Sequence, residues 1–69
     1  MNMNGNYIYL KCNTGSGYFA GIMLTSMGQE VKVHTDKSRA YRFKSKQEAY
    51  SMANQLKAKF KCVISYTIL

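Results

Sequence analysis

The sequence contains no proline, two cysteines, one histidine and three acidic residues. Since it also lacks internal repeats and low-complexity stretches, nothing in it suggests a linker between domains. Its longest apolar run is far shorter than the roughly 20 residues that span a bilayer, and its start lacks the charged and cleavage regions of a signal peptide. The sequence therefore predicts one domain over residues 1–69, with 1–6 flexible, in an intracellular protein that does not bind a membrane.

Scarce acids and a single histidine argue against catalysis and metal binding. Neither Glu30 nor Asp36 is spaced to build a recognisable nucleophile, base and orienting group with His34. A metal site would need more ligands than these residues and the cysteines supply, and a domain of this size leaves no room for a deep cleft. We predict a non-enzymatic protein with no catalytic residue, cofactor or metal.

The two cysteines, Cys12 and Cys62, stand fifty residues apart and form no CxxC motif. One hypothesis is a disulfide or redox switch, since both fall on predicted strands that could pair. The favoured one is two small apolar residues facing a common core, because free cysteine is among the most buried residue types. The sequence leaves the choice open.

The first half of the chain alternates as half-buried strands do. Residues 7–13 place Ile8, Leu10 and Cys12 on one side, and 18–24 read as the return strand after a TGSG turn whose glycines supply positive φ. Gly21 suggests a bulge or a point of close approach in that strand. A second turn, TSMGQ, leads to a strand over 30–35 with its valines inward and its lysine and histidine outward.

A helix is predicted from Ser45 onward. Ser45 and Glu48 make an S-x-x-E capping box, in which hydroxyl and carboxylate satisfy open backbone N–H groups. An apolar stripe at spacings of three and four follows and is expected to dock on the sheet: Ala49, Met52, Ala53, Leu56 and Phe60. Before the helix, Asp36 is suited to cap a single helical turn, after which Tyr41 and Phe43 enter the core or a short edge strand.

The last strand is expected over 62–68, with Cys62, Ile64, Tyr66 and Ile68 on one face and Val63 on the other. The order β-β-β-α-β predicts an α+β domain, a small antiparallel sheet with one helix on one face. We expect the core to include Ile8, Leu10, Ile22, Val31, Val33, Phe43, Met52, Leu56, Phe60 and Ile64.

Positive charge and tyrosine are what the sequence has in excess. Ten Lys and Arg residues give a net charge of +7, which favours polyanions or an acidic protein face as partners. Tyr7, Tyr9 and Lys11 alternate onto the non-core side of the first strand. If 39–46 is extended, its basic side chains project together while Tyr41 and Phe43 point inward. The predicted partner-binding residues are Tyr7, Tyr9, Lys11, Arg39, Arg42, Lys44 and Lys46.

The segment from Thr35 to Ala49 resembles a pattern, T-D-x-x-x-A-x-x-F-x-S-x-x-E-A, of small uncharacterised bacteriophage and prophage proteins; Ala40, Phe43 and Ser45 are among its matching positions. The resemblance implies a non-catalytic accessory protein in the cytoplasm of an infected bacterium. Proteins of that kind commonly bind and disable a host enzyme or a defence complex, anti-CRISPR inhibitors being one class.

Two functions follow as predictions. The first is a phage-type protein that inhibits or modulates a host or defence protein, including one in a nucleoprotein complex. The alternative is a small basic module that contacts the phosphates of DNA or RNA. The chain is expected to act as a monomer or as a homodimer, since the terminal strand ending at Leu69 could pair with a second copy.

Overall fold

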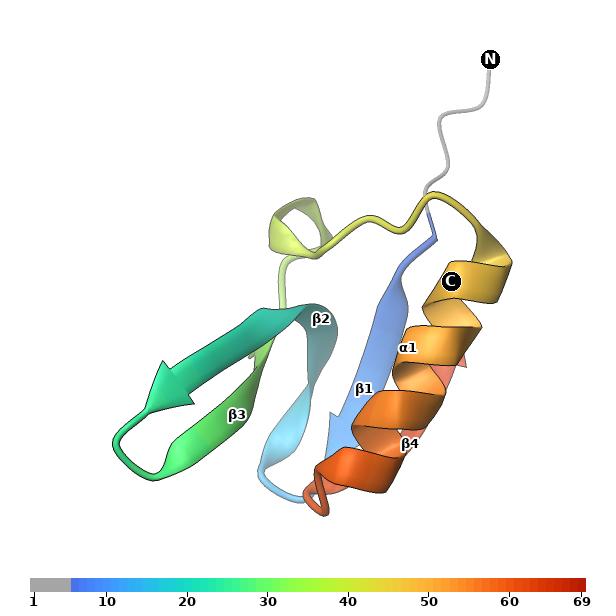
Figure 1. Ribbon diagram of the computed structural model, residues 1–69. Helices are drawn as coiled ribbons and strands as arrows, with labels where there is room; N and C mark the ends of the chain where they lie inside the picture. Colours follow the sequence, from blue (N-terminus) through green and yellow to red (C-terminus); the bar gives the residue numbers. More distant parts are fainter. Residues whose placement is uncertain (1–5) are drawn as a thin grey trace.

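The computed structural model describes residues 6–69 and contains a four-stranded antiparallel sheet with one α-helix packed against it (Figure 1). The elements follow the order β-β-β-α-β, which confirms the predicted α+β class. Across the sheet the strand order is β3-β2-β1-β4. The elements are β1 (Ile8–Cys12), β2 (Gly15–Thr25), β3 (Gly28–His34), the 3-10 turn η1 (Lys37–Arg39), α1 (Lys46–Lys59) and β4 (Val63–Ile68).

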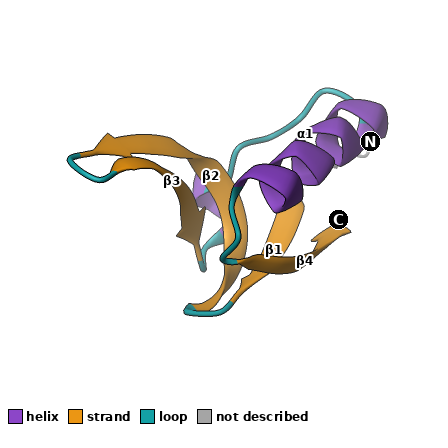
Figure 2. Ribbon diagram, turned by 60° about the horizontal axis from the view of Figure 1, so that its bottom comes forward, coloured by secondary structure: helices purple, strands orange, loops and turns teal. Residues whose placement is uncertain are grey.

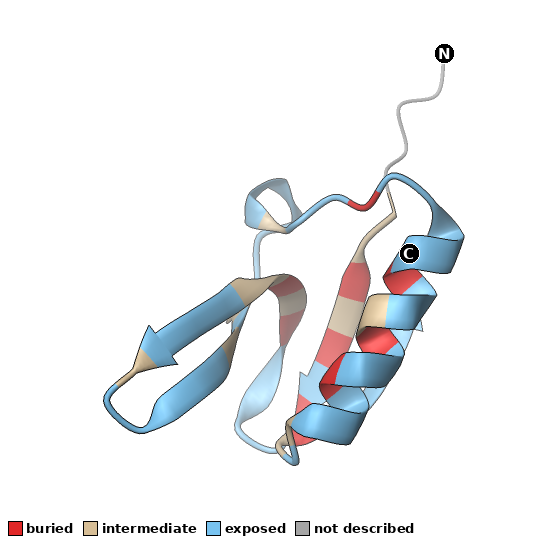
Figure 3. Cartoon of the chain, viewed as in Figure 1, coloured by how far each residue is buried: buried red, intermediate tan, exposed pale blue. Residues whose placement is uncertain are grey.

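The helix covers one face of the sheet, and the core lies between the two (Figures 2 and 3). Ile8 and Leu10 of β1 are fully buried, and Leu56 of α1 is 1% exposed. This cluster confirms the inward side of β1 and the predicted helix stripe. Its buried members are Ile8, Leu10, Cys12, Phe19, Phe43, Ala49, Ala53, Leu56 and Val63, with Val31, Val33, Met52 and Phe60 partly buried against them.

The helix begins where the capping box predicts. The Ser45 side chain accepts a hydrogen bond of 3.1 Å from the backbone N–H of Glu48, and the helix starts at the next residue, Lys46. At the other end, Lys57 and Lys59 lie in the last turn, where their positive charge interacts favourably with the negative end of the helix dipole. The Ser45 cap therefore fixes the start of α1, and the two lysines stabilise its last turn.

We expect Ser45→Ala to lower the free energy of unfolding by about 1 kcal/mol, because it leaves one N–H group at the start of the helix without its acceptor. Chemical denaturation measures the change. Ser51→Ala removes the same hydroxyl from an exposed position inside α1 and should have little effect. Equal losses in the two variants would contradict the capping role.

The hairpin between β1 and β2 turns earlier than the sequence suggests. Its turn residues are Asn13 and Thr14, and Gly15, with φ of +143°, already pairs with Cys12. Gly17, in contrast, has no positive φ. A Cβ atom there would lie 2.9 Å from the backbone oxygen of His34, so Gly17 is needed for the close approach of β2 and β3.

Beyond this hairpin, β2 and β3 leave the body of the domain as a two-stranded arm (Figure 1). The β2–β3 register shifts between Phe19 and Gly21, so the predicted bulge at Gly21 is confirmed. Ile22 lies past the bulge, beyond the reach of α1, and is 43% exposed. The prediction that Ile22 belongs to the core is therefore wrong.

A second irregularity reverses the predicted faces at the start of β4. Lys11 pairs with Ser65 but Cys12 pairs with Val63, which leaves Ile64 as an extra residue in a bulge. As a result Val63 is 5% exposed and Ile64 is 52% exposed. The predicted core position of Ile64 and the outward position of Val63 are both wrong, because strict alternation does not hold across a bulge.

The connection from β3 to α1 contains the predicted helical turn. Asp36 caps η1 by accepting a hydrogen bond of 3.0 Å from the backbone N–H of Ser38. Of the two predicted fates of this segment, core or short edge strand, Phe43 shows both, because it is buried and forms an isolated bridge. Tyr41 is not a core residue: its ring packs against Phe19 and Phe43 but is 54% exposed. Asn6, expected to be flexible, forms a bridge with Phe43, while the rest of the predicted flexible segment, residues 1–5, lies outside the described residues.

Over residues 6–69 no helix is both long enough and apolar enough to cross a bilayer.

Candidate functional site

The face of the sheet opposite α1 carries a row of ring side chains. Side chains alternate along a strand, so the burial of Ile8 and Leu10 beneath the helix places Tyr9 on the other face. Tyr9 pairs with Tyr18 of β2 and with Thr67 of β4, and Tyr18 pairs in turn with His34 of β3. One row across all four strands therefore reads His34, Tyr18, Tyr9 and Thr67. We call the face that bears it the outer face.

The two tyrosines at the centre of this row contact each other. Their ring centroids lie 5.0 Å apart with an interplanar angle of 76°, the edge-to-face geometry that aromatic pairs prefer. Both rings are only partly buried, as is His34. Part of each ring surface thus remains open to a ligand.

Basic side chains flank the row. Lys11 lies two residues from Tyr9 on β1 and is exposed, and Lys32 lies two residues from His34 on β3 and is also exposed. The neighbours of Lys11 across the strands are Ser16 and Ser65, which are small and polar. These lysines bring positive charge to the outer face next to the rings.

Tyr7 extends the outer face by one row. Its backbone exchanges two hydrogen bonds with Leu69, of 3.1 and 2.9 Å, so the β1–β4 pairing continues past β1. The Lys37 ammonium of η1 lies over the Tyr7 ring, 4.9 Å from its centroid, in a cation–π contact. This contact places the positive charge of Lys37 at the Tyr7 end of the outer face.

Two of the predicted basic residues, Arg42 and Lys44, flank Phe43 in the segment that bridges to Asn6. Phe43 points into the core and its backbone N–H donates a 2.8 Å hydrogen bond to Asn6, so alternation directs Arg42 and Lys44 to the side on which Tyr7 lies. Arg39 is the last residue of η1, and in the described part of the chain no contact of its side chain with the outer face is seen. The predicted extended ladder ends at Lys44, because Lys46 is already the first residue of α1.

The three acidic residues do not cancel the positive charge beside the rings of the outer face. Glu48 lies in the first turn of α1, on the other side of the sheet. Asp36 is engaged locally: hydrogen bonds from the backbone N–H and the hydroxyl of Ser38 lower the pKa of its carboxyl below the ordinary value. Glu30 pairs with Met23 on the arm and lines a pocket on the helix-bearing side. Within the described residues, no three His, Cys, Asp or Glu side chains gather as metal ligands.

Of the predicted partner-binding residues, Tyr7, Tyr9 and Lys11 share the outer face, Arg42 and Lys44 flank Phe43 near its Tyr7 end, and Arg39 and Lys46 lie in η1 and α1. The sequence did not predict Tyr18 and Lys37 as part of the site. The signal for Tyr18 was the hairpin register: a two-residue turn at Asn13 and Thr14 pairs it with Tyr9, whereas a turn over TGSG does not. The position of Lys37 depends on the path of η1, which no pattern specified.

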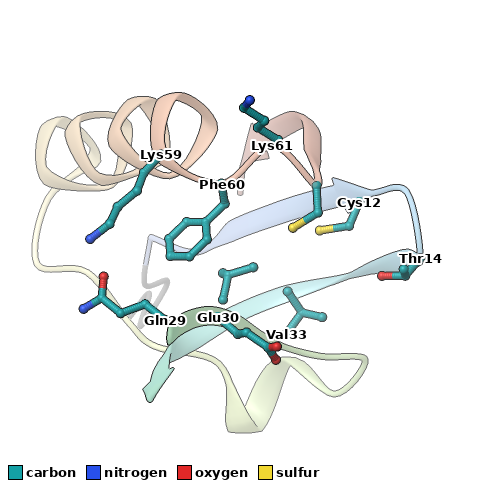
Figure 4. Close-up of a pocket in the computed structure, with 10 residues that line it drawn as sticks. Cys12, Thr14, Gln29, Glu30, Val33, Lys59, Phe60 and Lys61 are labelled. Atoms are coloured by element: carbon teal, nitrogen blue, oxygen red, sulfur yellow. The ribbon is translucent and has the colours of Figure 1, made fainter. Parts of the chain in front are cut away.

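A pocket of about 430 Å³ opens on the opposite, helix-bearing side, although the chain length suggested no room for a cleft. It lies between the base of the arm and the end of α1 (Figure 4). Phe60 enters it from the helix end, and Val31 and Val33 of β3 complete its apolar lining. The charged residues that line it are Glu30, Lys59 and Lys61. The pocket and the outer face are therefore separate sites.

Comparison with known proteins returns no match for this chain, whether against protein-family models, curated proteins or solved structures. Its function must therefore be inferred from its own surface.

Proposed function

We propose that the protein binds single-stranded nucleic acid across the outer face of its sheet. The observation that carries the proposal is the row of Tyr9, Tyr18 and His34 with Lys11 and Lys32 beside it. Rings that offer a surface to unpaired bases, set among cations that contact phosphates, are the means by which proteins hold single strands without sequence preference. A net charge of +7 favours the encounter.

Single strands suit this face better than duplexes. In a duplex the bases are stacked on each other and cannot stack on tyrosine, whereas in a single strand they are free to do so. A duplex would also require an element that enters a groove. The helix α1 packs on the other face of the sheet and buries its apolar stripe there, so it is not presented beside the rings.

Removing two lysines from the outer face should weaken binding and reduce its dependence on salt. We expect Lys11→Gln with Lys32→Gln to lower the salt dependence for a labelled single strand by about 1.4 in the slope of log affinity against log salt, since each phosphate contact contributes about 0.7. Fluorescence anisotropy across a salt series measures both quantities.

The matched control is Lys57→Gln with Lys59→Gln, which removes the same charge from the last turn of α1. It should leave the slope nearly unchanged. If both pairs reduce the slope equally, the attraction is a property of net charge and the outer face is not the site.

A second function is favoured by a different observation, the exposed apolar tip of the arm. Leu24 is 81% exposed and Met27 is 89% exposed, with Ile22 and Met23 beside them. Exposed apolar clusters of this kind often mark protein interaction sites. The arm thus supports the prediction of a protein that binds a host or defence protein, in the bacterial cytoplasm that the phage resemblance implies.

Two double variants, one in the arm and one on the outer face, distinguish the two functions. We expect a host protein captured through the arm to be lost when Leu24 and Met27 are both changed to Ser, and to be retained when Tyr9 and Tyr18 are both changed to Ala. Nucleic-acid binding should show the reverse. A captured protein that the arm variant retains would count against the second function.

A further inference from the structure

The two cysteines meet at one end of the pocket. Cys12 ends β1, and Cys62 immediately precedes β4, where its backbone oxygen accepts a 3.0 Å hydrogen bond from the N–H of Asn13. Both thiols are free and both line the pocket, and the pairing of Cys12 with Val63 places Cys62 directly beside Cys12. This arrangement goes beyond the packing of two small apolar residues against one core.

The two thiols differ in their access to solvent. Cys12 is 9% exposed, whereas Cys62 is only partly buried and lies in the turn between α1 and β4. Burial, and then the neighbouring Cys62, raise the pKa of the Cys12 thiol. Because the thiolate is the nucleophile in disulfide exchange, Cys62 is the better placed of the two to react first.

The pocket beside the thiols suits a small anionic reactant. Its volume of about 430 Å³ lies within the range of small-molecule sites. Among the charged residues that line it, Lys59 and Lys61 outnumber the single carboxylate of Glu30, and Phe60 supplies an apolar wall. Oxidised glutathione is a peptide disulfide with several carboxylates, and these lysines would attract it.

We propose that Cys12 and Cys62 form a redox-active dithiol, which low-molecular-weight disulfides such as oxidised glutathione convert into an intramolecular disulfide. The Cys62 thiolate attacks one sulfur of oxidised glutathione, forming a mixed disulfide and releasing one glutathione thiolate. Cys12, deprotonated, then attacks the sulfur of Cys62 and releases the second glutathione. The protein loses two electrons and two protons, and one oxidised glutathione becomes two reduced ones.

The inference is independent of the proposed nucleic-acid binding, since both cysteines lie on the helix-bearing side. The new bond would join the end of β1 to the turn before β4 and close a loop of about fifty residues. A crosslink of this span restricts the unfolded chain, so the oxidised protein should melt roughly 10 °C or more above the reduced protein.

Mass spectrometry of the folded protein, incubated with oxidised glutathione, tests the proposal. The native chain should lose the mass of two hydrogen atoms and carry no lasting adduct. Cys12→Ser should accumulate one glutathione on Cys62, because no second thiol resolves the mixed disulfide. Cys62→Ser should react at least about tenfold more slowly than Cys12→Ser, since its remaining thiol is buried.

Cys12→Ala, which keeps the site apolar, repeats the test in case serine at the buried position unfolds the domain; circular dichroism checks the fold of each variant. A lasting glutathione adduct on the native chain, no reaction at all, or equal rates in the two single variants would each overturn the proposal.

Discussion

Replacing Leu56 with Ala should lower the free energy of unfolding by about 2 to 5 kcal/mol, the range for removing a large buried aliphatic side chain. Leu56 is 1% exposed and sits among the fully buried Ile8, Leu10 and Ala53. A domain of this size has only roughly 3 to 10 kcal/mol in total. The melting temperature should therefore fall by about 8 °C or more, and the most severe outcome is a largely unfolded chain.

Leu24→Ala is the matched control, because it removes the same atoms from a side chain that is 81% exposed. Its melting temperature should stay close to that of the native chain. If Leu56→Ala melts with the native protein, or if the two variants lose equal stability, the placement of α1 on the sheet is wrong.

Replacing Tyr9 and Tyr18 together with Ala should lower the affinity for a single strand by about tenfold to a thousandfold, since base stacking on an aromatic ring contributes about 1 to 3 kcal/mol. The ring centroids of Tyr9 and Tyr18 lie 5.0 Å apart at the centre of the outer face, so among residues 6–69 removing both leaves the rings of Tyr7 and His34 on it. Anisotropy with a labelled oligonucleotide at constant salt measures the loss.

Two further variants distinguish stacking from general damage. Tyr9→Phe with Tyr18→Phe keeps both rings and should retain most of the affinity. Tyr50→Ala removes an exposed tyrosine from α1, on the other side of the sheet, and should bind like the native chain. A phenylalanine variant as weak as the alanine variant would assign the contribution to the hydroxyl groups and contradict stacking.

Sequence patterns predicted the parts of the fold that depend on local chemistry. The stripe through Leu56 and the cap at Ser45 specify α1, because hydrophobic spacing and backbone N–H groups act over one or two turns. Ile8 and Leu10 likewise marked the inward side of β1 by alternation alone. In the candidate site, the same alternation placed Tyr9 and Lys11 together on the opposite face.

The parts that were missed depend on pairing between distant segments. A bulge at Ile64 exchanged the faces of Ile64 and Val63, and no feature of one strand shows where its partner requires an extra residue. Ile22 was misplaced because its exposure depends on where α1 ends over the sheet. Tyr18 was missed because its place beside Tyr9 follows from the hairpin register.

The central claim is that the outer face binds single-stranded nucleic acid, and an NMR titration of the labelled protein with a short single-stranded oligonucleotide tests it most directly. We expect the largest chemical-shift changes at Tyr9, Tyr18 and His34, with smaller ones at Lys11 and Lys32 and almost none on α1. Saturable shifts concentrated on α1 or on the arm tip, or no saturable shifts at physiological salt, would contradict the claim.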